Sequence, residues 1–94
     1  MFESILKKLR EKIRLRQFVM SLHAVDEMED DQLSVFDIEH CILSGDIVER
    51  QKDKDTNEWK YLINGNSLSN ESVEVVAKLS ITGKLIIITV YLCE

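Results

Sequence analysis

The sequence contains no proline, only three glycines and only two cysteines, and each scarcity excludes a class of site. Three glycines are too few for a phosphate-cradling loop or a dinucleotide fingerprint, and no nucleophile elbow is present. The cysteines, Cys41 and Cys93, are far apart, and together with His23 and His40 they match no zinc-ligand spacing. We therefore expect no metal and no cofactor.

Long apolar runs are also missing. The longest spans residues 85–88 and stops at Thr89, so nothing is long enough to cross a bilayer. Residues 1–9 have neither the continuous apolar core nor the cleavage site of a secretory signal. We predict a cytoplasmic protein with reduced thiols, and its 94 residues predict one domain over residues 1–94.

Lys and Arg are absent from residues 20–47, a segment that holds eight Asp and Glu. Residues 1–19 instead hold six Lys and Arg and two Glu. The net charge of -5 does not favour nucleic-acid binding, because phosphate contacts supply much of that affinity. The segregation suggests that the basic N-terminus pairs with the acidic middle of the same chain.

Helical patterns occupy the first half of the chain. Apolar residues recur at helical spacing over residues 2–18 with Lys and Arg between them, which predicts an amphipathic basic helix over about residues 1–17. A second helix begins near Ser21. A third has Ser34 as its N-cap and Asp37 at the capping-box position, and Gly45 is expected to end it in a left-handed conformation.

The second half of the chain changes to strand patterns. Strands are expected at residues 46–51, 59–63, 72–79 and 85–92, separated by polar loops and turns. The predicted fold class is α+β, with two or three N-terminal helices packed on a mostly antiparallel four-stranded sheet.

Polar residues interrupt these apolar strands and predict a site. Alternation places Thr89 and Tyr91 on one face together with Leu85 and Ile87. With suitable registers, that face collects the strand residues Arg50, Lys60, Lys78, Thr89 and Tyr91. A cationic face with nearby hydroxyls is suited to phosphate. The alternative is a solvated face with cross-strand ion pairs such as Lys60 with Glu74.

A second candidate site lies on the expected second helix. His23 and Glu27 are four residues apart, and Asp31 is four further on, so one helical face carries an imidazole beside carboxylates. A neighbouring carboxylate fixes the tautomer of the ring, which suits a general acid or base. The alternative is an exposed histidine at the start of an acidic helix.

Six segments in register carry a family resemblance: residues 20–28, 37–39, 45–50, 58–61, 75–78 and 83–91. With them the chain resembles, over about residues 18–92, the bacterial family called domain of unknown function 4258. That family is similar to small toxins of the RelE/ParE-like or barnase-like α+β fold. Many members are encoded beside a small zinc-finger antitoxin with CxxC motifs. The resemblance implies the same fold and a ribonuclease of a toxin–antitoxin pair, with RNA and the antitoxin as partners.

The family's His-Ala motif falls on His23-Ala24, and its pattern His-Ala-x-x-Arg-Met has an arginine where this chain has Glu27. The implied reaction is metal-independent RNA cleavage through the substrate 2′-hydroxyl. His23 would be the general acid or base, oriented by Glu27, and Tyr91 would bind or protonate the substrate. The residues implied to hold the substrate are Arg50, Lys60, Lys78 and Thr89.

A non-enzymatic reading is also open: a protein-interaction module or an inactive toxin-like domain. It is motivated by the basic helix of residues 1–17, which lies outside the matched region. This helix could pack on its own acidic middle, form a homodimer or dock on an acidic partner. Membrane-surface binding is disfavoured by the acidity of the rest of the chain.

Overall fold

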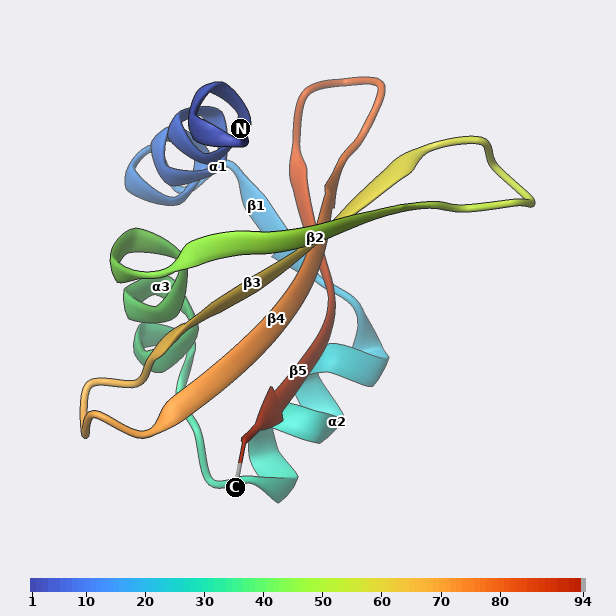
Figure 1. Cartoon of the computed structure of the whole chain (residues 1–94). Coiled ribbons are helices and arrows are strands. Elements are labelled where there is room, and N and C mark those ends of the chain that lie inside the picture. Colours follow the sequence, from blue (N-terminus) through green and yellow to red (C-terminus); the bar gives the residue numbers. More distant parts are fainter. Residues whose placement is uncertain (94) are drawn as a thin grey trace.

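The computed structural model describes residues 1–93 and has an α+β fold (Figure 1). The helices are α1 (Glu3–Arg14), α2 (Leu22–Asp30) and α3 (Val35–Ser44). The strands are β1 (Phe18–Met20), β2 (Asp46–Lys52), β3 (Trp59–Asn66), β4 (Ser72–Leu79) and β5 (Leu85–Leu92). The predicted class is confirmed, but the sheet has five strands and not four.

The strand order is β1-β5-β4-β3-β2, in which β1 is parallel to β5 and the other pairs are antiparallel. Strand β1 is the one that the sequence analysis missed. The basic helix was expected to extend to about residue 17, but α1 ends at Arg14 and Arg16 turns the chain with a φ of 58°. A strand of three residues is too short to show a period of two.

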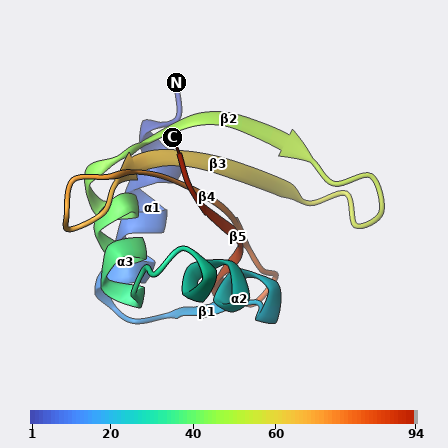
Figure 2. The same cartoon turned by 90° about the horizontal axis from the view of Figure 1, so that it is seen from below.

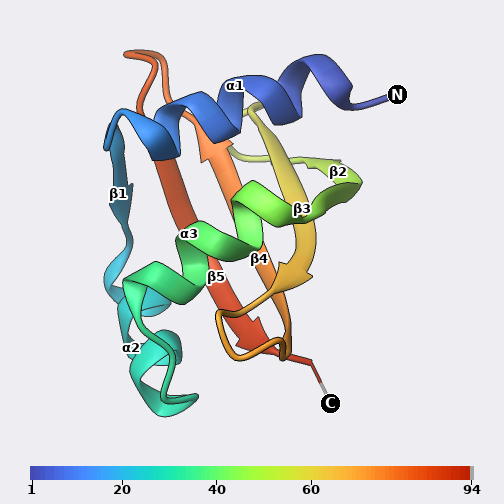
Figure 3. The same cartoon turned by 90° about the vertical axis from the view of Figure 1, so that its left-hand side faces the viewer.

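Helices α1 and α3 cover one face of the sheet and enclose the core (Figure 3). Their apolar stripes face the inward side chains of the central strands, and burial of these side chains is the main stabilising term of the fold. The fully buried side chains at the centre include Leu9, Ile38, Ile42, Ile63, Val75 and Ile87.

Basic helix α1 packs on its own domain. The Arg10 guanidinium donates to the carbonyls of Gly45 (2.8 Å) and Ile42 (3.4 Å), which lie at the C-terminal end of α3. Arg16 forms an ion pair with Glu39 of α3 at 2.9 Å. A guanidinium at a helix C-terminus satisfies carbonyls that have no partner within the helix. The expected pairing of the basic N-terminus with the acidic middle is therefore present.

The capping box of α3 is confirmed, whereas the role predicted for Gly45 is wrong. Asp37 accepts from the Ser34 N–H at 2.8 Å and from the Leu68 N–H of the β3–β4 connection at 2.9 Å. Gly45 has a φ of -94°, which is not left-handed. Glycine is needed there because a Cβ would stand 2.3 Å from the carbonyl oxygen of Asn64.

Helix α2 lies beside the C-terminal half of β5 and takes the place of a neighbouring strand (Figure 2). Ser21 donates its hydroxyl to the Ile88 carbonyl at 3.0 Å. Further along the strand, the Val90 N–H donates to Glu27 at 3.1 Å, and the Leu92 N–H donates to Asp31 at 2.9 Å. These side chains satisfy the backbone groups that β1 is too short to reach.

Two bulges change which side chains share a face. Ile88 is an extra residue in β5 between the pairs Ala77–Ile87 and Val76–Thr89. Leu85 and Ile87 are consequently in the core, although simple alternation placed them with Thr89 and Tyr91. Val48 is the corresponding extra residue in β2. An extra residue reverses the alternation of everything that follows it in the strand.

Candidate functional site

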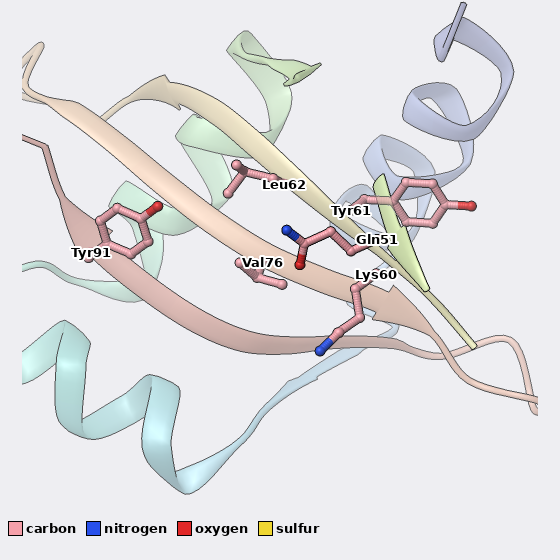
Figure 4. A pocket seen from close by; sticks show the side chains of 6 residues that line it. All are labelled: Gln51, Lys60, Tyr61, Leu62, Val76 and Tyr91. Carbon is pink, nitrogen blue, oxygen red and sulfur yellow. The ribbon is translucent and has the colours of Figure 1, made fainter. Parts of the chain in front are cut away.

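The sheet face opposite α1 and α3, here called the open face, carries four of the five predicted strand residues. Registers and alternation place Lys60, Lys78, Thr89 and Tyr91 on it. A hollow of about 140 Å³ lies at its centre (Figure 4). The side chains that frame it include Gln51, Lys60, Leu62, Val76 and Tyr91, whereas the ring of Tyr61 points away from them.

Arg50 is not on the open face, and this corrects the prediction. It pairs with Tyr61, whose side chain is buried on the helix side of the sheet. The bulge at Val48 is the cause, because it turns Glu49 to the open face and Arg50 to the other. The Arg50 guanidinium lies 4.3 Å from the centre of the Trp59 ring.

Both lysines of the open face are ion-paired. Lys78 Nζ lies 3.1 Å from Glu58, and Lys60 Nζ lies 3.7 Å from Asp53. The Asp55 and Thr56 N–H groups lower the pKa of Asp53, with a smaller contribution from Lys60, so Asp53 remains charged. Lys60 with Glu74, the example given for the alternative solvated face, is not the pair that forms, because Lys60 pairs with Asp53 and Glu74 accepts from Tyr91. A phosphate would have to compete with these carboxylates for the two cations.

Tyr91 donates its phenolic hydroxyl to Glu74, its direct partner on β4. This hydrogen bond is the main reason that the pKa of Tyr91 rises to about 12; partial burial and the negative charge of Glu74 add to it. Glu74 also accepts from the Cys93 thiol at 3.4 Å. At neutral pH the Tyr91 hydroxyl is therefore protonated, and it can donate a proton but cannot act as a base.

His23 and Glu27 form the pair that their spacing predicts. His23 Nε2 lies 3.2 Å from Glu27 Oε1, and the same oxygen accepts from the Val90 N–H. The imidazole is mostly exposed, whereas the Glu27 carboxylate is largely covered. Tyr91 follows Val90 directly, so the histidine and the phenol are anchored at adjacent positions of β5. Glu27 thus orients His23 and also closes the edge of the sheet.

Sequence analysis missed Gln51 as part of this surface, and it named Glu74 only as a cross-strand partner of Lys60 and not as the partner of Tyr91. Both lie on polar positions of strands with one solvated face, which carry no distinguishing spacing. Their relevance appears only when register places Glu74 opposite Tyr91 and Gln51 opposite Lys60.

Within residues 1–93, no group of three or more His, Cys, Asp or Glu side chains could hold a metal ion. Burial raises the pKa of the Cys41 thiol to about 12, so this sulfur is an inert part of the core. In the same part of the chain, no helix is long and apolar enough to span a membrane.

Fold and site together define a small α+β protein with helices on one sheet face and a polar hollow on the other. A family model described as Domain of unknown function (DUF4258) matches residues 20–92, and the chain belongs to that family. Comparison with curated proteins and with solved structures returned no match. The match begins after α1 and includes every strand residue of the candidate site.

Proposed function

We propose that this domain is the toxin of a toxin–antitoxin pair and cleaves RNA on the open face without a metal. The observation that carries the proposal is the arrangement along β5. Tyr91, held by Glu74, lines the hollow together with Lys60, and His23 is held by Glu27, whose carboxylate accepts from the N–H of the neighbouring Val90. Such a reaction needs a general base, a general acid and a positive charge near the phosphate, and an imidazole, a phenol and a lysine can supply them.

In this reaction His23 takes the proton of the substrate 2′-hydroxyl. The 2′-oxygen bonds to phosphorus, the bond from phosphorus to the 5′-oxygen breaks, and Tyr91 gives its proton to the leaving oxygen. A 2′,3′-cyclic phosphate and a 5′-hydroxyl result. Lys60 and Lys78 stabilise the charge of the phosphorane, and Thr89 lies between them and Tyr91 on the same face.

The test is RNA cleavage and growth arrest by variants that preserve the fold. We expect His23→Ala to lose about 10²–10⁴-fold in cleavage rate, because that is the usual contribution of a general acid or base. Tyr91→Phe should lose a comparable factor. His40→Ala is the matched control, because His40 lies on α3 and binds the Asn66 carbonyl. Full activity of His23→Ala would contradict the assignment.

A second function is favoured by the ion pairs of Lys60 with Asp53 and Lys78 with Glu58. Cations that are already neutralised suit a solvated surface of a non-catalytic protein-interaction module. The same assays separate the two functions. A folded parent protein that neither cleaves RNA nor arrests growth, yet binds the product of a neighbouring gene, would support the module.

A further inference from the structure

Strand β2 is the second edge of the sheet, and it differs from the edge beside β5 because no helix of residues 1–93 closes it (Figure 1). Six of its seven residues, all except Ile47, are exposed. The Asp53 N–H donates to Glu58 across the hairpin at 2.8 Å, so residue 53 faces β3. By alternation Gln51 also faces β3, while Arg50 and Lys52 turn their N–H and C=O groups outward.

These two residues place two positive charges on the helix side of the edge, whereas the carboxylate of Glu49 points to the open face. Arg50 lies 4.3 Å and Lys52 5.4 Å from the centre of the Trp59 ring, so both cations are held by one aromatic face. Among residues 1–93 neither cation has a carboxylate partner within ion-pair distance, unlike Lys60 and Lys78.

Pairing of β2 with a second copy of itself is disfavoured. A two-fold axis perpendicular to the sheet has to place one residue opposite its own copy. If the axis passes beside Glu49 or Arg50, that residue lies directly opposite its own copy, so two like charges meet. If the axis passes beside Gln51, Arg50 of one copy lies opposite Lys52 of the other. Like charges directly opposite each other destabilise a strand pair. The edge therefore suits a different chain with negative charge.

We propose that β2 receives an extended acidic peptide segment of a partner protein as a sixth strand. The backbone of the segment would bond to the outward groups of Arg50 and Lys52, and its acidic side chains would point to the helix side. There they meet the two cations over Trp59. A nucleic-acid strand could use the cations but not the row of backbone groups. This inference concerns a surface separate from the open face and does not depend on RNA cleavage.

The test uses the full chain and a blocked octapeptide that alternates glutamate and threonine. We expect it to bind and to shift the backbone amide resonances of Arg50 and Lys52. The double variant Arg50→Glu/Lys52→Glu should bind at least about tenfold more weakly. Lys8→Glu/Lys84→Glu is the control with the same charge change at exposed positions, and it should bind like the parent apart from a small non-specific loss.

A second probe separates strand addition from plain charge attraction. The same peptide N-methylated at every second residue keeps its charge but loses the backbone donors on one edge, and we expect little binding. Equal binding of the methylated peptide, or equal losses in the two double variants, would overturn the proposal. So would shifts confined to other elements, or binding of a uridine oligonucleotide at this edge in preference to the peptide. Dispersion of the amide spectrum confirms that each variant is folded.

Discussion

The two edges of the sheet differ in whether their outward backbone groups have hydrogen-bond partners. Beside the C-terminal half of β5, the side chains of Ser21, Glu27 and Asp31 form hydrogen bonds with successive outward backbone groups. They take the place of a neighbouring strand there, because β1 does not extend that far. Beside β2, the backbone groups of Arg50 and Lys52 face solvent. Proteins commonly cover or charge an edge strand, because an unpaired edge can add another chain. This protein covers one edge with carboxylates and marks the other with cations, so only the second can select an acidic strand.

Glu27 contributes both to the structure of the sheet edge and to the position of His23. Its carboxylate holds the Val90 N–H and faces His23 through the same oxygen. Loss of activity in a Glu27 variant would mix a catalytic with a structural effect. His23 is the cleaner probe, because its imidazole is mostly exposed and its removal leaves the edge closed.

Removing the carboxylates that cover the edge beside β5 is expected to have the largest effect on the free energy of unfolding. In Glu27→Ala/Asp31→Ala the Val90 and Leu92 N–H groups lose their acceptors, and we expect the free energy of unfolding to fall by about 3 kcal/mol. Urea unfolding measures it. The control is Glu29→Ala/Asp30→Ala, which removes the same charge from exposed positions of α2. Equal losses in the two variants would show that net charge, and not edge closure, is what matters.

Asp37 provides a reference for a carboxylate that binds backbone N–H groups away from either edge. Its pKa is lowered from 3.8, first by the Ser34 N–H and also by the Leu68 N–H. A lowered native pKa means that the stabilisation is present above the unfolded-state value and is lost as the pH falls through the native value.

We therefore expect Asp37→Asn to lower the free energy of unfolding by about 1 kcal/mol at pH 7. The parent and the variant should converge as the pH falls through the lowered native pKa of Asp37, because the parent carboxylate is then also protonated. Denaturant unfolding of both proteins across this range measures the effect. A difference that persists unchanged at low pH would indicate that packing, and not the charged cap, is responsible.

Removing the two cations of β2, the edge strand that no helix covers within residues 1–93, is expected to have the smallest effect on stability. Arg50→Gln/Lys52→Gln should change the free energy of unfolding by less than about 0.5 kcal/mol, because both side chains are exposed. In both proteins the amide protons of Arg50 and Lys52 should exchange at least about a hundredfold faster than those of Val90 and Leu92. Protection of the amides of residues 50 and 52 in the free protein would contradict the distinction between the edges.

Much of the candidate site was predictable because it depends on local spacing. His23 and Glu27 meet because residues four apart share a helical face. Lys60 and Lys78 were placed correctly because strands β3 and β4 are regular. Arg50 was misplaced because alternation was carried through a bulge, and Tyr91 reached the expected face only because Ile88 is also bulged. Nothing in the local sequence marks either extra residue.

The sequence by itself determined the helices, the four longer strands, the capping box of α3 and the His23–Glu27 pair. These features follow from periods and spacings within a few residues of each other. Tertiary structure alone decided the short strand β1, the two bulges, the ion pairs of the open-face lysines and the closure of β5 by α2. Those features join residues far apart in the chain, where register and packing select among contacts that local sequence allows equally.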